Sequence, residues 1–417
     1  MQQVLIVAYF FPPIGGIGSI RAASFAKYLP EFGWEATVLA PADTPHAADP
    51  SLDIGQVRVL RTRSLEISRL GRRPSIGRNG TEVAAPHQPV ARSAPSRWLR
   101  RAAKRVIFPD AQIGWYPAAV KGGTGLLRDQ PFDLIFSSAF PITSHFVART
   151  LKRRSSLPWV AEFRDPWSDD PEFRFLSKAA LRVERSMAAE ASAVVLPNQI
   201  WADYYADRWG VQAAVVGHGS DATPRGSVPR ASPPMLAHLG SYYPGKQNLD
   251  TLWSALAEMR RRGDSIPRLR WIGELPEAAR TELAGHDLED IVEVTGFVPQ
   301  PEALSLMSEA SGLIACDVAN CDLVSLGTTP AKLFEYLASD APIIYVGHQR
   351  GEAARALNRY PGCHLVSFGD VDGAIRAIQT TMAGEAHQRD LAGLSRSART
   401  EELAGLFDTV MRRRNGD

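Results

Sequence analysis

The chain has 417 residues, of which 45% are hydrophobic and 22% are charged, and this composition is typical of soluble globular proteins. At roughly 150 residues per domain, the length predicts two or three domains. Lysine and arginine together number 47 against 45 acidic residues, which leaves a formal charge of +2. So small a charge excludes a chain-wide field that would attract nucleic acid, and we expect no nucleic-acid partner.

The beginning of the chain predicts a cytoplasmic protein. The apolar run 4–11 follows no basic residue and is broken by two prolines, so we expect neither a secretory signal nor a membrane span, which takes about 20 residues. The three cysteines form no C-x-x-C pair, so neither a disulfide framework nor a zinc site is expected at Cys316, Cys321 and Cys363.

The first half of the chain alternates short β-branched runs with helical patterns, which is typical of βαβ units and a parallel sheet. Strands are predicted at 4–8, 35–39, 57–60, 133–137, 159–162, 193–196 and 214–217. Helices are predicted at 21–32, 117–130, 142–154 and 175–191. The fold class is therefore α/β.

The same alternation restarts after residues 222–234, which are rich in proline and serine and have the composition of a linker. Strands are then predicted at 236–239, 269–272, 291–295, 312–315, 342–346 and 364–367. Helices are predicted at 248–262, 277–283, 301–310, 330–339, 351–359 and 371–382. We therefore predict two facing, Rossmann-like doubly wound domains, over 1–221 and 235–394, with ligands beyond the carboxyl ends of their strands in the cleft.

One basic stretch interrupts the first domain. Between residues 58 and 105, thirteen basic residues stand against two acidic ones. Within it, 97–107 has an apolar helical face opposite a row of arginines and a lysine. This pattern is typical of a solvated surface helix; the alternative is peripheral contact with anionic lipid headgroups at the inner face of a membrane, or with an anionic acceptor.

Two segments have the composition of phosphate-binding sites. Gly15 and Gly16 lie in a loop between the first strand and a helix, where glycine lets the backbone approach a ligand and the helix N-terminus attracts an anion. The loop is not the G-x-G-x-x-G pattern of a dehydrogenase, and its alternative is a tight turn. In 326–338, Thr329 can cap a helix, Lys332 lies at its positive end, and Glu335 can accept ribose hydroxyls or form a surface ion pair.

Five motifs in combination resemble family 4 glycosyltransferases of the GT-B fold, in the subgroup with Lys-Leu-Phe-Glu-Tyr. They are Pro-Pro-Ile-Gly-Gly at 12–16, Phe-Arg-Asp-Pro-Trp at 163–167, His-Gly-Ser-Asp at 218–221, Gly-Phe-Val-Pro at 296–299 and Pro-Ala-Lys-Leu-Phe-Glu-Tyr-Leu at 330–337. The resemblance implies retaining transfer of a sugar from a nucleotide-diphosphate sugar to a glycan, lipid-linked or secondary-metabolite acceptor. It also implies that 395–417 form a helix that crosses back to the first domain.

The resemblance assigns roles residue by residue. It implies that Glu335 holds the donor ribose and Lys246 the diphosphate, and that Arg164 and Asp165 face the reacting sugar. The remaining donor-binding positions are Gly15, Gly16, Phe297, Val298, Thr329 and Lys332, with the backbone of Phe297 and Val298 beside the nucleobase. Because two lysines and a helix N-terminus can stabilise the leaving diphosphate, we expect no metal and no cofactor besides the nucleotide sugar.

Three positions depart from the family pattern. Gly327 stands where many relatives have the first glutamate of a Glu-x7-Glu motif, Ser241 replaces the usual arginine before the lysine, and Arg164 replaces the histidine of a His-Asp pair. These changes suggest a branch of the family. They also leave two rival functions open, a non-catalytic partner that binds nucleotide sugar for another transferase, and a sugar-nucleotide epimerase.

Three further candidates carry less weight. His145 follows a strand and could reach an acceptor, or could be satisfied locally. Asp169 and Asp170 could suggest a metal but precede a proline at the start of a predicted helix, and Asp317 follows a strand and could approach the donor.

Overall fold

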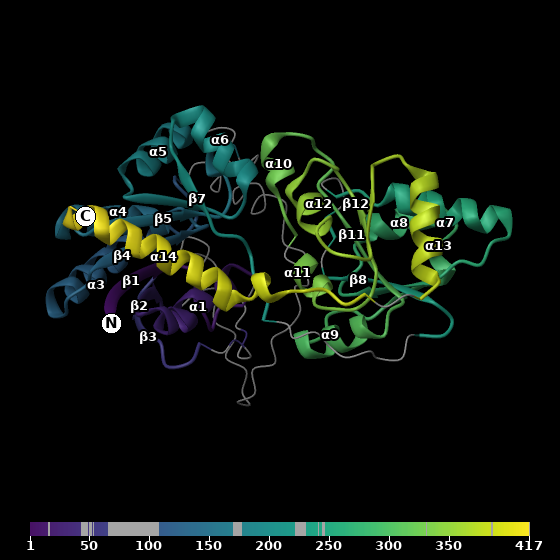
Figure 1. Ribbon diagram of the computed structural model, residues 1–417, viewed down its shortest axis with the longest axis horizontal. Coiled ribbons are helices and arrows are strands. Elements are labelled where there is room, and N and C mark those ends of the chain that lie inside the picture. Colours follow the sequence, from purple (N-terminus) through teal and green to yellow (C-terminus); the bar gives the residue numbers. More distant parts are fainter. Residues whose placement is uncertain are drawn as a thin grey trace, which may run out of the picture. The chain divides into compact units, whose positions relative to one another are not determined.

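The computed structural model describes residues 1–15, 17–42, 49, 52, 54–65, 108–169, 177–221, 231–240, 242–243, 247–330, 332–384 and 387–416. It divides into two compact units (Figure 1). Unit 1 comprises Met1–His218 and Arg396–Asp417, and unit 2 comprises Gly219–Ser395. The basic helix predicted at 97–107 lies outside the described residues, as do Gly16, Ser241 and Lys246.

Unit 1 is built on a seven-stranded parallel sheet in the order β3-β2-β1-β4-β5-β6-β7. Its strands are β1 (Gln2–Ala8), β2 (Trp34–Pro41), β3 (Arg58–Thr62), β4 (Leu134–Ala139), β5 (Trp159–Phe163), β6 (Ala193–Leu196) and β7 (Ala213–Val215). Its helices are α1 (Ile17–Tyr28), α3 (Tyr116–Asp129), α4 (Thr143–Ser155), α5 (Ser177–Glu190), α6 (Gln199–Trp209) and α14 (Arg396–Asn415).

One face of this sheet is covered by α1 and α14, which come from opposite ends of the chain (Figure 1). The alternating residues Val4 and Ile6 of β1 pack in one core with Phe25 of α1 and Phe407 of α14. The Trp34 indole donates to Asp408 of α14 at 2.9 Å. The last helix is therefore part of the hydrophobic core of unit 1.

Helix α3 lies close to β2, β3 and α4 because it contains two adjacent glycines. A Cβ atom at Gly122 would lie 2.7 Å from Thr62 Cγ2, and one at Gly123 would lie 2.6 Å from Leu151 Cδ1. Only glycine leaves room for this approach.

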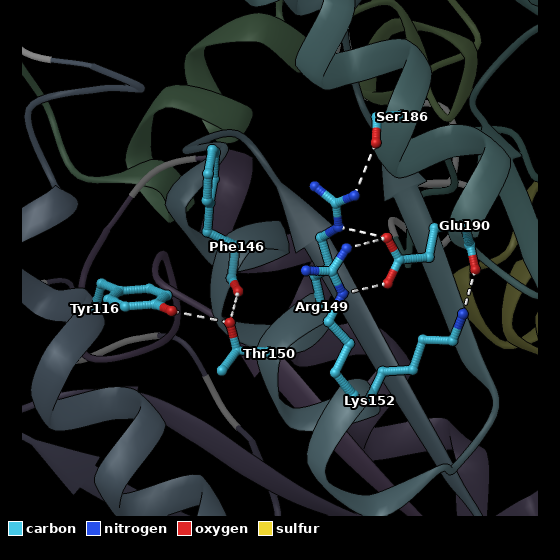
Figure 2. Close-up of polar contacts among 8 residues, drawn as sticks. Tyr116, Phe146, Arg149, Thr150, Lys152, Ser186 and Glu190 are labelled. Atoms are coloured by element: carbon cyan, nitrogen blue, oxygen red, sulfur yellow. Dashed lines mark hydrogen bonds and ion pairs between the residues drawn. The ribbon is translucent and has the colours of Figure 1, made fainter.

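A network of ion pairs joins α4 to α5 at Glu190 (Figure 2). Arg149 Nε donates to Glu190 Oε2 at 2.6 Å, and Arg153 Nε donates to Oε1 at 2.8 Å. Lys152 donates to the Glu190 carbonyl, which lies at the end of α5 where a cation is favoured. Hydrogen bonds from Arg153 and Arg149 lower the pKa of Glu190 to about 2, although partial burial opposes this shift.

Unit 2 is built on a six-stranded parallel sheet in the order β10-β9-β8-β11-β12-β13. Its strands are β8 (Met235–Leu239), β9 (Arg268–Ile272), β10 (Val292–Val294), β11 (Gly312–Cys316), β12 (Ile343–Val346) and β13 (Cys363–Val366). Its helices are α7 (Asp250–Arg262), α8 (Glu277–Gly285), α9 (Gln300–Ser308), α10 (Leu323–Gly327), α11 (Lys332–Leu337), α12 (Glu352–Leu357) and α13 (Val371–Met382).

Alternate residues of these strands face two separate cores. Ile314 and Ile344 pack with α7, α8 and α13, whereas Leu313 and Ile343 pack with α9, α11 and α12. Both sheet faces are therefore covered, as a parallel sheet requires, and the predicted α/β fold with two Rossmann-like units is confirmed.

Several predicted elements differ from the structure. Helix α1 ends at Tyr28 instead of residue 32, because Pro30 stops the α-helix and a 3-10 turn, η1 (Leu29–Phe32), follows. Helix α6 was not predicted, although Asn198 caps it by accepting from Trp201 N at 2.9 Å and Gly210 ends it in the left-handed conformation. Helix α10 was not predicted either, and α11 is shorter than the expected 330–339.

Candidate active site

The strand order of unit 2 reverses between β8 and β11, so the loops that follow these two strands lie at the place where doubly wound sheets bind ligands. Tyr336 of α11 joins the two strands there. Its hydroxyl accepts from Leu239 N at 2.8 Å and donates to Ile314 O at 3.1 Å. The tyrosine of the Lys-Leu-Phe-Glu-Tyr motif therefore has a structural function, since it fixes α11 at the switch point of the sheet.

Lys332 is the first residue of α11, and its ammonium lies beside a buried histidine. Lys332 Nζ is 2.9 Å from Nε2 of His238, which is the fourth residue of β8 and 1% exposed. Burial lowers the pKa of Lys332 to about 8 and that of His238 well below its usual value. The pair therefore consists of an ammonium and a neutral imidazole at neutral pH.

Glu335 lies on the next turn of α11 and is half-buried. Thr329 is half-buried in the segment before α11 and, because the helix begins at Lys332, it does not directly precede the helix. Gly327, at the position of the absent first glutamate, is the last residue of the unpredicted helix α10, which Asp322 caps by accepting from Ser325 N at 2.7 Å.

Phe297 and Val298 lie in the loop after β10, at the outer edge of the sheet. The Phe297 side chain is 81% exposed, whereas Val298 packs against the core that contains α11. Gly296 has a φ of 70°, a left-handed conformation that favours glycine, so the loop turns sharply after Thr295.

Asp317 directly follows the interior strand β11, at its carboxyl end, and is buried. Its carboxylate accepts from Val318 N at 2.8 Å, and burial raises its pKa. A Cβ atom at Gly351 would lie 3.4 Å from Asp317 Oδ2, so the loop that follows β12 packs against this carboxyl group.

In unit 1, Arg164 follows β5 and connects the end of β4 to the first turn of α1. Its Nε donates to Ala139 O and its Nη1 to Gly18 O, both at 2.9 Å, and its Nη2 donates to Phe140 O. A Cβ atom at Gly18 would lie 2.8 Å from Arg164 Nη1, so any other residue at this position would force the guanidinium to shift. Asp165 follows and is exposed.

A second arginine forms a buried ion pair next to this one. Arg21 of α1 lies 2.7 Å from Glu162 of β5, with side-chain exposures of 7% and 0%. Ser138 donates to the other carboxylate oxygen at 2.5 Å, and Arg21 also donates to Val216 O at 2.7 Å and Gly217 O at 2.6 Å. Arg21 therefore holds the chain segment that leaves β7.

His218, the first residue of the His-Gly-Ser-Asp motif, lies among these arginines. Burial, together with the charges of Arg21, Arg164 and Arg399, lowers the pKa of His218 to about 3. This histidine is consequently neutral at physiological pH.

The loop with Arg164 and Asp165 is fixed by a buried carboxylate that the sequence did not reveal. Glu184 of α5 is inaccessible to solvent and accepts from Trp167 N and Ser168 N, both at 2.8 Å, and from the Tyr205 hydroxyl at 2.6 Å. Burial raises its pKa. The 3-10 helix η4 (Trp167–Asp169) is therefore attached to α5 through its backbone.

The structure places His145 in the interior of unit 1. Its ring is inaccessible to solvent, and the ring centroids of His145 and Phe163 are 4.3 Å apart. Its Nδ1 is 2.8 Å from Ser137 Oγ. Burial, with the charge of Arg164, lowers its pKa to about 3. A local hydrogen bond, one of the two alternatives at this position, is therefore present.

Sequence analysis did not select four charged or titratable residues of these networks, namely Arg21, Glu162, Glu184 and His238. Each is part of a strand or helix pattern, and only tertiary structure places them near loop residues that were selected. Among the described residues, no group of three or more histidine, cysteine or acidic side chains could hold a metal. Asp169 accepts from the Tyr204 hydroxyl, and Asp170 lies outside the described part.

No helix in the described ranges has the length and apolarity that crossing a membrane requires.

The three cysteines carry free thiols; Cys316 is buried, Cys321 exposed and Cys363 intermediate.

Two family models match the chain in sequence. The model of a glycosyl transferase 4-like domain matches residues 15–217, and that of glycosyl transferases group 1 matches residues 233–383. A comparison with curated protein sequences gave no match.

Solved structures with the same fold cover the whole chain. Sucrose-phosphate synthase from Thermosynechococcus elongatus is 15% identical, with a TM-score of 0.60 and coverage of 100% of this chain and 98% of that one. The lipopolysaccharide outer core galactosyltransferase WaaB is 12% identical, with a TM-score of 0.59 and coverage of 98% and 99%. Anabaena HepE in complex with UDP-glucose is 14% identical, with a TM-score of 0.55 and coverage of 99% and 98%.

Proposed function

Since this chain belongs to the family 4 glycosyltransferases of the GT-B fold, we propose that it transfers a sugar from a nucleotide-diphosphate sugar with retention of configuration. The observation that carries the proposal is α11, which Tyr336 fixes at the switch point of the unit 2 sheet with Lys332 and Glu335 on it. HepE, which has the same fold, has been solved with UDP-glucose and with UDP.

The donor is assigned to unit 2. Lys332 and Lys246 contact the diphosphate and Glu335 accepts the ribose hydroxyls, because ammonium groups complement phosphate and an ionised carboxylate accepts two hydrogen bonds. Phe297, Val298 and Thr329 complete the nucleotide site.

The reacting sugar is assigned to unit 1, where Gly15 and Gly16 provide backbone close to the diphosphate and Asp165 faces the sugar. Arg164 joins the end of β4 to the first turn of α1 through three backbone carbonyls, and this contact supports a positioning role toward Asp165.

In the proposed reaction, the bond between the anomeric carbon and the diphosphate oxygen breaks, and the acceptor oxygen bonds to that carbon on the same face. The acceptor hydroxyl proton passes to the leaving diphosphate, so no enzymatic nucleophile is needed. The two lysines stabilise the negative charge that develops on the leaving group, and we propose that the reaction is independent of divalent metal.

The experiment that tests this function is a thermal-shift screen with UDP, GDP, dTDP and ADP sugars, followed by a transfer assay with the donor that stabilises the chain. A ligand at 100 times its dissociation constant stabilises by about 2.7 kcal/mol. Nucleoside diphosphate release that requires an acceptor supports transfer. Donor binding without release favours the non-catalytic partner, and interconversion of the sugar nucleotide favours the epimerase.

Metal independence and Lys246 are tested in the same assay with excess chelator. We expect full activity with chelator, and a loss of roughly 10²–10³-fold in turnover for Lys246→Ala, by analogy with removal of one oxyanion donor. Activity that chelator abolishes and magnesium restores contradicts the metal-free mechanism.

We also propose a cytoplasmic location with peripheral membrane contact through residues 97–107. Replacing Arg97, Arg100, Arg101 and Arg105 by serine should reduce binding to anionic vesicles, with about 1 kcal/mol for each charge. If the unaltered protein does not bind such vesicles at low salt, the acceptor is a soluble molecule.

A further inference from the structure

His238 of β8 contacts an aromatic ring and an ammonium group within unit 2. Its ring stacks on Trp271 of β9, with 4.0 Å between ring centroids and an angle of 19° between planes. Its Nε2 lies 2.9 Å from Lys332 Nζ, on the first residue of α11. The stack fixes the ring plane, and therefore the direction in which Nε2 points.

The chemistry of the two groups determines the histidine tautomer. An ammonium group can only donate, so Nε2 accepts and the ring hydrogen is on Nδ1. Nδ1 is buried and has no hydrogen-bond partner among the described residues. Among the described residues, the contact with Lys332 is therefore the one hydrogen bond that the His238 ring makes.

A neutral partner has a different effect on a lysine than a carboxylate has. A carboxylate would orient the ammonium but cancel its charge, whereas an imidazole orients it and leaves the full positive charge for an anionic ligand. Two titratable groups near Lys332 are neutral near pH 7, because burial raises the pKa of the Cys316 thiol to about 12 and raises that of the Tyr336 hydroxyl as well.

We propose that His238 is a positioning residue for Lys332, whose ammonium it holds at the switch point of the unit 2 sheet with its charge available to the donor diphosphate. The second half of this statement rests on the proposed function, in which Lys332 contacts the diphosphate. Its first half concerns the two side chains alone and can be measured without substrate.

The experiment follows the titration of Lys332 by NMR in protein labelled with ¹⁵N,¹³C-lysine. The chain has seven lysines, and Lys332→Arg assigns the signal. We expect a midpoint near pH 8 in the unaltered protein, since burial lowers the pKa of Lys332 to about 8. His238→Phe keeps the stack on Trp271 but removes the acceptor, so the midpoint should fall by about one pH unit or more, which is the size of a charge-assisted hydrogen bond.

His238→Gln, which places an acceptor near the former Nε2, should leave the midpoint within a few tenths of a unit. His364→Phe, a matched ring substitution on β13 of the same unit, should not change it. If His238→Phe does not fold, His238→Asn, whose amide is too short to reach the lysine, makes the same comparison.

Nucleotide affinity provides the second readout. At pH 7.5, His238→Phe should weaken binding of the best nucleoside diphosphate about 10-fold, and should have no further effect in a Lys332→Met background. A Lys332 midpoint that is unchanged in a folded His238→Phe variant overturns the positioning role. If His238→Phe shifts the Lys332 midpoint but Lys332→Met does not change nucleoside diphosphate affinity, the positioning role stands and the role of Lys332 in the donor site is overturned. The two proposals can therefore fail separately.

Discussion

Replacing Glu162 by alanine is expected to destabilise unit 1 by about 3–5 kcal/mol, because it leaves the guanidinium of Arg21 buried without its carboxylate. The pair has Arg21 Nη2 and Glu162 Oε1 2.7 Å apart, and neither side chain is more than 7% exposed. The carbonyl groups of Val216 and Gly217 still accept from Arg21 after the substitution, which favours the lower end of this range.

The assay is equilibrium unfolding in urea, combined with hydrogen exchange that separates unit 1 from unit 2. Protection should fall in α1 and β5, which the pair joins, and stay unchanged in unit 2. Asp129→Ala is the control, because its pair with Arg128 is exposed and such pairs are worth about 0.2–1 kcal/mol.

A double substitution of Arg21 and Glu162 by methionine tests the physical reason. With both charges removed, no uncompensated charge is left, so the double variant should be more stable than the sum of the two single losses predicts. A cost below about 1 kcal/mol for Glu162→Ala, or additive single losses, would refute the reasoning that the buried charge is the source of the effect.

Three further substitutions test other parts of the structure. Glu335→Ala should weaken nucleoside diphosphate binding about 10- to 100-fold in calorimetry, since it removes charge-assisted hydrogen bonds, and unchanged affinity removes this residue from the site. Gly18→Val should lower the unfolding free energy by about 1–3 kcal/mol in urea, because its Cβ would lie 2.8 Å from Arg164 Nη1. The folded-state pKa of Glu190 lies at about 2, below the usual 4.5, so its ion pairs stabilise above pH 4.5 and this stabilisation is lost as the pH falls. The stability difference between the unaltered protein and Glu190→Gln should therefore shrink from pH 7 to pH 3 in urea unfolding.

The sequence predicted the fold well because its dominant signal is local. Segments such as 4–8 and 312–315 are continuous apolar runs, as expected of strands that are buried on both faces, and their alternation with helices predicts parallel sheets. The element that was missed most clearly is α6. Its buried residues are spread over about half of the helix circumference, so the sequence shows no narrow apolar face; they are Ile200, Trp201, Ala202 and Tyr205. Its asparagine cap and final glycine were the readable signals.

The candidate site was predictable only where its residues belong to sequence motifs. Arg164 directly follows β5, whereas Lys332 and Glu335 lie on α11, which comes after β11 and the short helix α10. The partners of these residues come from distant positions: His238 is 94 residues from Lys332, and Gly18 is 146 residues from Arg164. Such pairs leave no periodic trace, because a single polar residue in an apolar strand does not alter the pattern of that strand.

The motifs that identify the family also prove to be partly structural, which affects how substitutions in them should be interpreted. Tyr336 connects β8 to β11, and Arg164 uses three of its donors on backbone carbonyls, so loss of activity on altering either residue does not by itself place it in contact with substrate. Glu335 differs, because it is half-buried on the helix that Tyr336 fixes and its replacement should leave that contact intact. Substitution of Glu335 should therefore change nucleotide affinity and leave stability unchanged, whereas substitution of Tyr336 should lower stability. Comparing the two separates the residue that binds the nucleotide from the residue that holds the helix in place.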